Sequence, residues 1–365
     1  MSTNSKITVL VAPLDWGLGH STRCIPLIKH LLLLGCKVII AAEGLQKKLL
    51  KTEFPNVIFT DIPGYNVKYT KAKRFQSLKI AIQVPKILII ILSEKRWLDN
   101  FVKKNKVHAI ISDNRFGLFH PKVTSVFITH QLLIKAPFSF LEKIIQKINY
   151  RYINRFSECW VPDEKGAVNL AGALSHPAKL PEIPVKYLGG ISRLNQQHLD
   201  NEYDVLIILS GPEPQRTLLE EKVLAQLDHF TGRAMLLRGL PGAAEVLTAK
   251  GGVVIKNHLS AKDLEKVINQ SDLVISRSGY TTVMDICKLQ KKSVLIPTPG
   301  QTEQEYLALH LHQQGWCIAA SQEEFSLVDS IAEAQNFNYR LPNLKMDSYK
   351  EVLSKFIQEL ESNIE

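Results

Sequence analysis

A histidine follows two closely spaced glycines near the start of the chain, in the run Gly17-Leu-Gly-His20. The apolar residues Ile7–Val11 predict a strand before this run, and the pattern after it predicts a helix that begins at about His20. Glycines let the backbone turn sharply, and the free N–H groups of a helix start point toward a ligand. The helix dipole disfavours a protonated imidazole there, so His20 is predicted to be neutral and to act as a general base. The competing interpretation is a tight turn with a capping histidine.

The same glycine run also resembles part of a dinucleotide-binding fingerprint, G-x-G-x-x-G. Its third position is Thr22 rather than glycine, and a histidine follows the second glycine, which weakens that interpretation. Glu43, after the second predicted strand, is the residue type that would bind the ribose of NAD and keeps the interpretation open.

Further polar residues follow predicted strands in the second half of the chain and precede helices. Such junctions present hydroxyls, backbone N–H groups and helix starts to phosphate groups. The Asp285 carboxylate is expected to reach the two hydroxyls of a ribose. Glu303 and Gln304 are of the residue types that form hydrogen bonds with sugar hydroxyls. The competing interpretation needs no ligand. Serine, glycine and proline after a strand form ordinary turns, and carboxylates or amides in the first turn of a helix stabilise its dipole. The candidates are Ser210, Gly211, Arg216, His258, Leu259, Arg277, Ser278, Gly279, Asp285, Glu303 and Gln304.

Short apolar strands and longer amphipathic helices alternate along most of the chain, which predicts an α/β fold with parallel sheets whose two faces are covered by helices. The Gly-, Asn- and Gln-rich stretch near 189–201 is the predicted linker. We therefore expect two doubly wound domains that face each other across a cleft. The expected boundaries are 1–190 for the first domain, 191–203 for the linker, 204–345 for the second domain and 346–365 for a C-terminal helix. Apolar residues at helical spacing in that helix predict that it packs back on the first domain.

Composition limits the class of protein and its compartment. The chain has 365 residues, 45% apolar and 22% charged, which excludes wholesale disorder. Five widely spaced cysteines indicate a reducing compartment, and neither a signal peptide nor a membrane span is predicted. We expect a cytoplasmic protein that can lie peripherally on the inner face of the membrane.

A net charge of +10 favours anionic partners. The segment Lys68–Lys86 mixes cations with apolar residues, which fits either a solvated basic helix face or contact with an anionic membrane surface. Scattered basic residues and the lack of a base-stacking or groove motif argue against nucleic-acid binding.

These motifs together resemble the family that includes the N-acetylglucosaminyltransferase forming lipid II, a family 28-like glycosyltransferase group. Its R-S-G-x-x-T-x-x-E stretch is similar to Arg277-Ser-Gly-Tyr-Thr-Thr-Val-Met-Asp285, and its P-x(n)-Q-Q segment to Pro297…Glu303-Gln304. Its G-x-G-H loop resembles Gly17-Leu-Gly-His20. The resemblance implies the GT-B fold, with two Rossmann-like domains, the acceptor on the first and a UDP-sugar on the second. It implies contacts of Ser210 and Gln215 near the diphosphate, of Ser278 and Gly279 on it, of Thr282 within the same motif, of Asp285 on the ribose, and of Glu303 and Gln304 on the sugar.

The expected function is therefore transfer of a hexose or N-acetylhexosamine from a UDP-sugar to a hydroxyl of a glycan or lipid-linked acceptor, with inversion. No D-x-D sequence occurs, so no metal and no cofactor besides the donor substrate is expected. Helix starts and Arg216 or Arg277 would stabilise the leaving diphosphate. The departures at Asp285 and Glu303 leave the donor sugar open.

Three other functions are compatible with the same residues. A UDP-sugar hydrolase of nonulosonic acid biosynthesis has a G-x-G-H-x-x-R-C loop, which Gly17–Cys24 matches more fully. A nucleotide-binding protein without turnover and a non-phosphorylating epimerase remain open because a fold does not determine a function.

Overall fold

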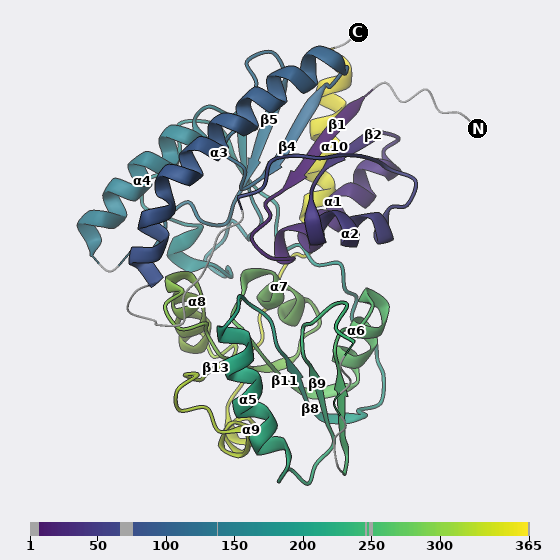
Figure 1. Cartoon of the computed structure of the whole chain (residues 1–365), viewed down its shortest axis with the longest axis vertical. Coiled ribbons are helices and arrows are strands. Elements are labelled where there is room, and N and C mark those ends of the chain that lie inside the picture. The colour runs from purple at the N-terminus through teal and green to yellow at the C-terminus, as the bar shows by residue number, and fades with distance from the viewer. Residues whose placement is uncertain (1–6, 66–75, 137, 245–246, 248–250, 364–365) are drawn as a thin grey trace. The chain divides into compact units, whose positions relative to one another are not determined.

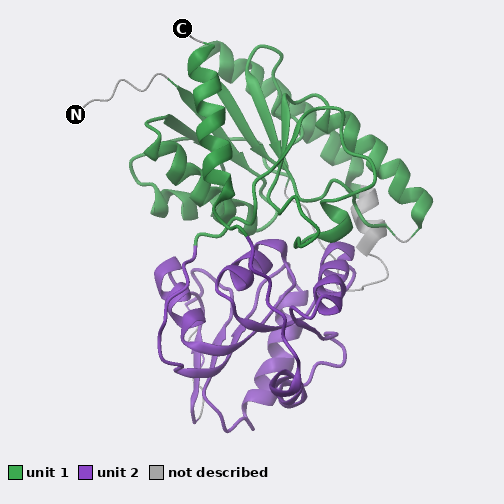
Figure 2. Ribbon diagram, turned by 180° about the vertical axis from the view of Figure 1, so that it is seen from behind, with its two compact units in different colours: residues 1–68, 80–193, 345–365 green, residues 69–79, 194–344 purple. Residues whose placement is uncertain are grey.

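The computed structural model describes residues 7–65, 76–136, 138–244, 247 and 251–363, without the side chains of 76–82. The chain divides into two compact units (Figure 2). The first consists of Met1–Lys68, Ile80–Arg193 and Lys345–Glu365, and the second mainly of Leu194–Leu344. The chain therefore passes from the first unit to the second at Arg193, within the predicted linker region, and returns at Lys345.

The first unit is built on a seven-stranded sheet in the order β3-β2-β1-β4-β5-β6-β7. Every neighbouring pair in it is parallel. The strands are β1 (Thr8–Pro13), β2 (Lys37–Ala41), β3 (Ile58–Thr60), β4 (Ala109–Asp113), β5 (Thr124–Ile128), β6 (Glu158–Val161) and β7 (Val185–Tyr187). The chain starts in the middle at β1, continues to one edge, and then returns to β4 beside β1. The order of strands thus reverses between β1 and β4, which is where ligands bind in open α/β sheets.

Helices cover both faces of this sheet (Figure 1). They are α1 (Gly19–Leu33), α2 (Gly44–Glu53), α3 (Gln76–Lys104), α4 (Ser139–Ile153), the short 3-10 helix η2 (Gly172–Leu174) and α10 (Ser348–Ser362). Helix cover on both faces explains why the strands are continuous apolar runs, because both of their faces are buried.

The C-terminal helix α10 packs against α1 of the first unit. Its apolar face, which includes Leu353, Phe356 and Ile357, is buried, and Phe356 contacts the ring of Trp160 in an edge arrangement. The Nε2 atom of His30 in α1 lies 3.0 Å from the Lys350 carbonyl of α10. These contacts make the last part of the sequence a structural element of the first unit.

The second unit has a six-stranded parallel sheet in the order β10-β9-β8-β11-β12-β13. Its strands are β8 (Tyr203–Ile208), β9 (Ala234–Leu237), β10 (Val253–Lys256), β11 (Ser271–Ser276), β12 (Lys292–Leu295) and β13 (Ile318–Ala319). Its helices are α5 (Gln215–Leu227), α6 (Ala261–Asn269), α7 (Tyr280–Lys288), α8 (Thr302–Gln313) and α9 (Leu327–Asn336). Here the order of strands reverses between β8 and β11. The predicted fold class, two Rossmann-like α/β domains with parallel sheets, is confirmed.

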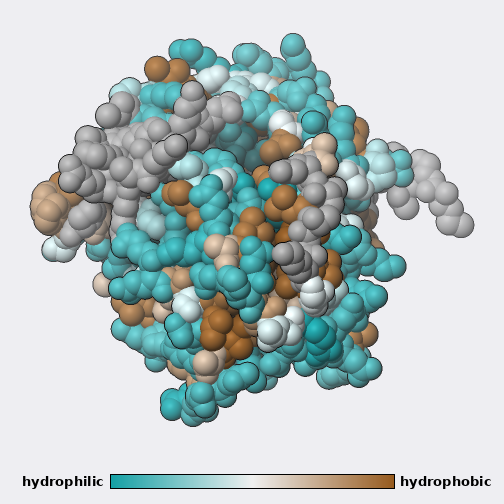
Figure 3. Space-filling view, turned by 60° about the horizontal axis from the view of Figure 1, so that its bottom comes forward, coloured by the Kyte–Doolittle hydropathy of each residue, from teal (hydrophilic) through white to brown (hydrophobic). Residues whose placement is uncertain are grey.

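Most of the exposed side chains are hydrophilic in the view of Figure 3, and hydrophobic ones form small separate groups there. Isolated apolar side chains on a surface are ordinary. Among the described residues, none of the helices combines the length and the hydrophobicity that crossing a bilayer requires.

Candidate active site

The loop between β1 and α1 places His20 in the first turn of α1. Gly17 has a positive φ of 80°, a conformation that glycine adopts without strain, and its N–H donates to the Asp15 carbonyl at 3.0 Å. Leu18 occupies the N-cap position and supplies no side-chain cap, so the first N–H groups of α1 are not used by a capping side chain. The tight turn therefore brings His20 and an uncapped helix start together at the carboxyl end of β1.

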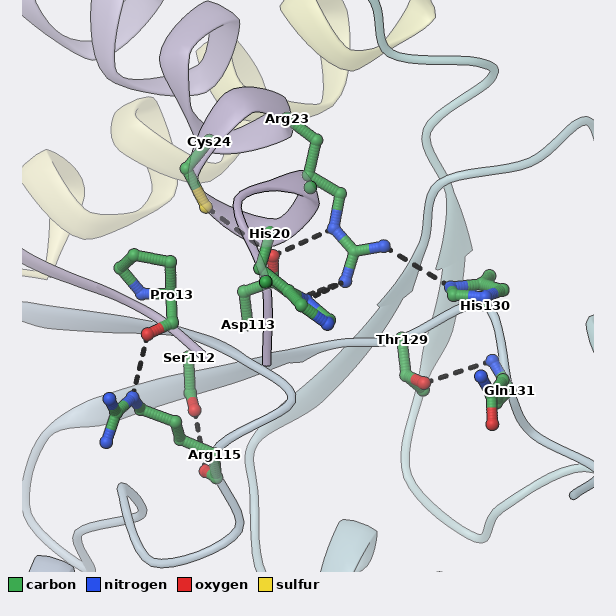
Figure 4. A network of polar contacts seen from close by, with 12 residues as sticks. Pro13, His20, Arg23, Cys24, Ser112, Asp113, Arg115, Thr129, His130 and Gln131 are labelled. Carbon is green, nitrogen blue, oxygen red and sulfur yellow. Dashed lines mark hydrogen bonds and ion pairs between the residues drawn. The ribbon is translucent and has the colours of Figure 1, made fainter. Parts of the chain in front are cut away.

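Asp113, the last residue of β4, lies beside this helix start. The register pairs it with Pro13, the last residue of β1, so the two strands that flank the reversal end side by side. The Asp113 Oδ1 atom is 3.1 Å from Nδ1 of His20 (Figure 4). Asp113 is therefore the carboxylate partner of the His20 ring.

Arg23, one turn further along α1, binds the same carboxylate with two nitrogens. Its Nε donates to Asp113 Oδ2 at 2.8 Å, and its Nη2 donates to Oδ1. The Arg23 Nη1 atom lies 3.3 Å from Nδ1 of His130, which follows β5. Cys24 also directs its thiol to Asp113 Oδ2. The result is a buried polar network of histidine, arginine and aspartate at the strand-order reversal (Figure 4).

The network keeps Asp113 ionised and His20 neutral at physiological pH. Burial opposes ionisation of Asp113, but Arg23 and His20 outweigh it and hold the pKa of this carboxyl far below its ordinary value. Burial lowers the pKa of His20 below 6.5; Asp113 opposes this shift, and Arg23 and His130 add to it. The sequence argument relied on the helix dipole for the neutral ring, whereas the structure adds burial as the leading cause.

The ring of His20 has one tautomer that suits a base. The Nδ1 atom of His20 faces both Asp113 Oδ1, at 3.1 Å, and Nη2 of Arg23, at 2.8 Å, and Arg23 carries only donors. The tautomer that carries its proton on Nδ1 donates to Asp113 and leaves the Nε2 lone pair for a substrate proton. The His20 side chain is 16% exposed, so the ring is held by the network and still reaches the surface.

In the second unit, two of the predicted loops meet at the reversal between β8 and β11. Gly211 follows β8 with a φ of 100°, and a Cβ built on it would lie 3.5 Å from Oγ1 of Thr298, which follows β12. Gly279 occupies the N-cap position of α7 without a side-chain cap, and a Cβ on it would meet only Thr282, at 4.0 Å. Open space and a helix start without a side-chain cap thus coincide at Gly279.

Other predicted ligand residues in this unit are part of its framework. Arg277 is 1% exposed, and its guanidinium donates to the carbonyls of Gln215, Ile296 and Pro297 and to the Gln322 side chain. Burial lowers its pKa to about 10. Arg216 is also buried and binds Glu213 and Glu220. Both guanidinium groups thus bind neighbouring protein groups, while the Nε atom of Arg277 has no hydrogen-bond partner among the described residues. Their contact with a diphosphate stays a prediction.

The side chains of Ser278 and Gln304 likewise hold the loops together. The Ser278 hydroxyl donates to the Gln304 carbonyl at 2.8 Å. The Gln304 amide accepts from the N–H of Thr298 and donates to Gln301. Both side chains were expected to contact the ligand directly, and that contact stays a prediction. In the structure they position the backbone of the two loops.

The remaining candidates are partly exposed or lie on a strand edge. Ser210, Thr282, Asp285, Glu303 and Leu259 are partly exposed, and His258 is exposed. His258 and Leu259 follow β10, the edge strand, which is separated from β8 by β9. Sequence reasoning missed Arg23 and Thr298 as members of these sites. The G-x-G-H-x-x-R-C match contained Arg23, but only the tertiary structure shows that it binds Asp113.

Comparisons with known proteins agree with this architecture. Residues 255–360 match the family model of the glycosyltransferase family 28 C-terminal domain. The chain is a GT-B glycosyltransferase. The curated "UDP-N-acetylglucosamine--N-acetylmuramyl-(pentapeptide) pyrophosphoryl-undecaprenol N-acetylglucosamine transferase" of Clostridium tetani is 22% identical over 356 residues, with 94% of each chain covered.

Solved structures share the fold of this glycosyltransferase. Acinetobacter baumannii MurG superposes with a TM-score of 0.54 at 15% identity, with 97% of this chain and 99% of that chain covered. The spinosyn rhamnosyltransferase SpnG gives a TM-score of 0.62 at 14% identity, with 97% and 96% covered. The resemblance inferred from the sequence motifs is thus confirmed.

Proposed function

We propose that this glycosyltransferase moves a hexose or N-acetylhexosamine from a UDP-sugar to a hydroxyl of a lipid-linked acceptor, with inversion and without a metal ion. The observation that carries this proposal is the His20–Asp113 pair at the strand-order reversal of the first unit. A neutral, partly exposed imidazole oriented by a buried carboxylate is the arrangement that general-base catalysis requires.

The chemistry follows from the two sites. The Nε2 atom of His20 accepts the proton of the acceptor hydroxyl, and Asp113 stabilises the imidazolium that forms. The acceptor oxygen bonds to C1 of the sugar while the bond from C1 to the UDP oxygen breaks on the opposite face, which inverts the configuration. The negative charge on UDP is stabilised by the N–H groups and dipoles of helix starts, among them the start of α7, where Gly279 supplies no side-chain cap. The proton on His20 then passes to solvent.

The names of the relatives support a finer assignment. The Clostridium tetani protein transfers N-acetylglucosamine to an N-acetylmuramyl-pentapeptide pyrophosphoryl-undecaprenol, according to its name. We infer the same classes of donor and acceptor here, a UDP-N-acetylhexosamine and a polyprenyl-diphosphate-linked saccharide of the cell envelope. Glu303, where that family has glutamine, is the residue most expected to change the donor sugar.

The experiment that tests this function measures UDP release from a panel of UDP-sugars in EDTA, with and without the lipid-linked acceptor. Acceptor-dependent UDP release that persists in EDTA is expected. Strict dependence on manganese or magnesium would contradict the metal-free mechanism, and release of equal rate without acceptor would favour the hydrolase. The hydrolase deserves this comparison because Arg23 and Cys24, which complete its loop motif, both contact Asp113.

We predict that UDP binds the second unit more tightly than ADP or GDP does, and that Asp285→Ala weakens UDP binding. Loss of charge-assisted bonds to the ribose is expected to cost roughly 1.5–3 kcal/mol. Isothermal titration of UDP measures the effect. Asp228→Ala is the matched control, because Asp228 lies at the C-terminal end of α5, which leads into the first residue of β9 and so to the amino ends of the strands. An equal dissociation constant in Asp285→Ala and wild type would remove Asp285 from the site.

An anionic membrane surface is the proposed partner of two helices of the first unit, which places the enzyme on the inner face of the membrane. Helix α3 exposes Val84, Leu88 and Leu92 at intervals of four residues, and α4 exposes Phe140, Ile144 and Ile148 in the same way. An adjacent stripe of α4 exposes Lys143, Lys147 and Arg151. Apolar side chains beside cations suit the boundary between lipid headgroups and acyl chains. Most of the basic segment Lys68–Lys86, the sequence-based candidate for this contact, lies outside the residues whose side chains are described.

We therefore expect the protein to sediment with vesicles of phosphatidylglycerol and phosphatidylcholine, and the double variant Ile144→Glu/Ile148→Glu to lose this binding. Each buried isoleucine side chain contributes roughly 1.5–3 kcal/mol, so the partition coefficient should fall more than tenfold. High salt should weaken binding of the wild type as well. Leu33→Glu, on an exposed position of α1, is the control. Unchanged sedimentation of the double variant would exclude this face.

A further inference from the structure

Trp16 is an exposed aromatic side chain on the loop that carries the catalytic histidine. Its indole is 39% exposed, in a loop between two regular elements, four residues before His20. A large aromatic side chain at this exposure loses the apolar burial that would stabilise the fold. Gly17, the next residue, has open space around it, since a Cβ built there would meet nothing within 4 Å. Trp16 is thus exposed next to a glycine with open space around it, four residues before the proposed base.

The backbone on both sides of Trp16 is fixed by one buried side chain. The Nε2 atom of Gln46 donates to the carbonyls of Asp15 and Gly17, at 3.0 Å and 3.3 Å. Gln46 is buried, so these bonds hold the turn without competition from water. The two hydrogen bonds from Gln46 therefore fix the backbone position of an exposed residue.

The Trp16 ring is supported by a contact with the buried ring of Tyr65. The Tyr65 ring meets the Trp16 ring edge to face, with centroids 6.2 Å apart. The Tyr65 hydroxyl donates to Glu94 at 2.8 Å, and Glu94 pairs with Arg115 at 2.8 Å. Arg115 in turn donates to the carbonyl of Pro13, where the loop begins (Figure 4). Support therefore runs from the indole through buried groups back to Pro13, the last residue of β1, directly before this loop.

The buried ion pair in this support is not explained by a gain in the stability of the fold. Glu94 and Arg115 are fully buried, and a buried ion pair is often no more stabilising than apolar residues of the same size. Its effect here is to fix the positions of Tyr65 and Pro13, and through them the indole. The geometry is that of a preorganised ligand contact, in which the ordering cost is met before the ligand binds.

We propose that Trp16 is a stacking platform for the pyranose ring of the acceptor and thereby determines acceptor specificity. The C–H groups on one face of a pyranose are apolar and weakly positive, and they pack on the negative face of an indole. The acceptor, rather than the donor, is the occupant because the indole shares its loop with His20, whose proton partner is the acceptor hydroxyl. The inference rests on the proposed function in this last step.

The first test uses the wild-type protein and soluble N-acetylmuramyl-pentapeptide as the probe, with no turnover. The chain has four tryptophans; Trp160 and Trp316 are buried and Trp97 is partly buried, so Trp16 dominates quenching of fluorescence by acrylamide. The probe is expected to shield wild-type fluorescence, and Trp16→Phe should abolish that shielding. UDP should give no shielding. Absence of shielding by the saccharide, or equal shielding in Trp16→Phe, would overturn the proposal.

The second test separates acceptor binding from donor binding in steady-state kinetics. Trp16→Ala is expected to raise the KM for the lipid-linked acceptor about tenfold, the worth of one aromatic stack, and to leave the KM for the donor unchanged. Trp16→Phe should recover part of the loss, and Leu33→Ala, another exposed apolar residue of this unit, should have no effect. A rise in both KM values would assign the indole to the donor or to the fold and would overturn the proposal. Failure of the wild type to transfer sugar would refute the proposed function, and the fluorescence result would still decide the role of Trp16.

Discussion

Replacing His20 with alanine is expected to lower turnover by about 10²–10⁴-fold, because the acceptor hydroxyl loses the base that removes its proton. Donor affinity should stay unchanged, since the proposed donor site lies in the second unit. The measurements are acceptor-dependent UDP release and UDP-sugar binding on the same folded variant. His30→Ala is a matched control, because His30 lies on the same helix and its ring contacts Lys350 and Ser354 of α10.

The pH profile gives an independent readout of the same base. The pKa of His20 lies below its ordinary value of 6.5, so the imidazole is neutral above that pH and gains a proton only in more acidic solution. The acid limb of kcat/KM is therefore expected below pH 6.5 and should be missing from the residual activity of His20→Ala. If His20 only capped the helix, the substitution would cost about 1 kcal/mol of stability and leave turnover per folded molecule nearly intact.

Asp113→Asn is expected to affect both turnover and stability. Turnover should fall by about 10²–10⁴-fold, because an amide does not fix the His20 tautomer or stabilise the imidazolium. The free energy of unfolding should fall by about 3–5 kcal/mol, because the Arg23 side chain, 2% exposed, keeps its buried charge without a counter-charge. Urea unfolding followed by activity of the folded fraction measures both effects.

Two further variants separate these effects. Arg23→Met/Asp113→Asn removes both charges and should recover stability but not turnover. Asp163→Asn alters a buried carboxylate of the same unit that accepts from Leu170, Ala171 and Ser175, and it should lower stability without lowering turnover per folded molecule. Equal turnover in Asp113→Asn and wild type would show that the carboxylate does not orient the base.

The stability of the wild type should also depend on pH through Asp113. Its folded-state pKa lies below that of the unfolded chain, so its contribution is complete above about pH 5 and is lost as the pH falls. Asp113→Asn should flatten this acid dependence.

Local patterns were sufficient for most of the fold. The apolar sequence at 37–41 predicts a strand and the amphipathic pattern at 261–269 predicts a helix, and these agree with β2 and α6 in every residue. Amphipathic helices repeat their apolar residues at helical spacing, and strands that are buried on both faces appear as continuous apolar runs. Both patterns can be recognised in the sequence alone. The sequence pattern does not predict α2, β6, β7, α9 or the two-residue β13. The shortest of these have too few residues for a period to be recognised.

The sequence by itself determined the class of site: glycine turns before helix starts, a histidine at one of them, and polar loops that match a sugar-transfer family. The tertiary structure decided what each side chain does there. Asp113 is 93 residues from His20 in the chain, and parallel pairing of β1 and β4 brings the two together. Arg216 and Arg277 have the charge that a diphosphate requires, yet buried carboxylates and carbonyls already occupy them. Spacing along the chain encodes local conformation, but the partner of a buried charge is set by strand order and packing, which bring distant residues into contact.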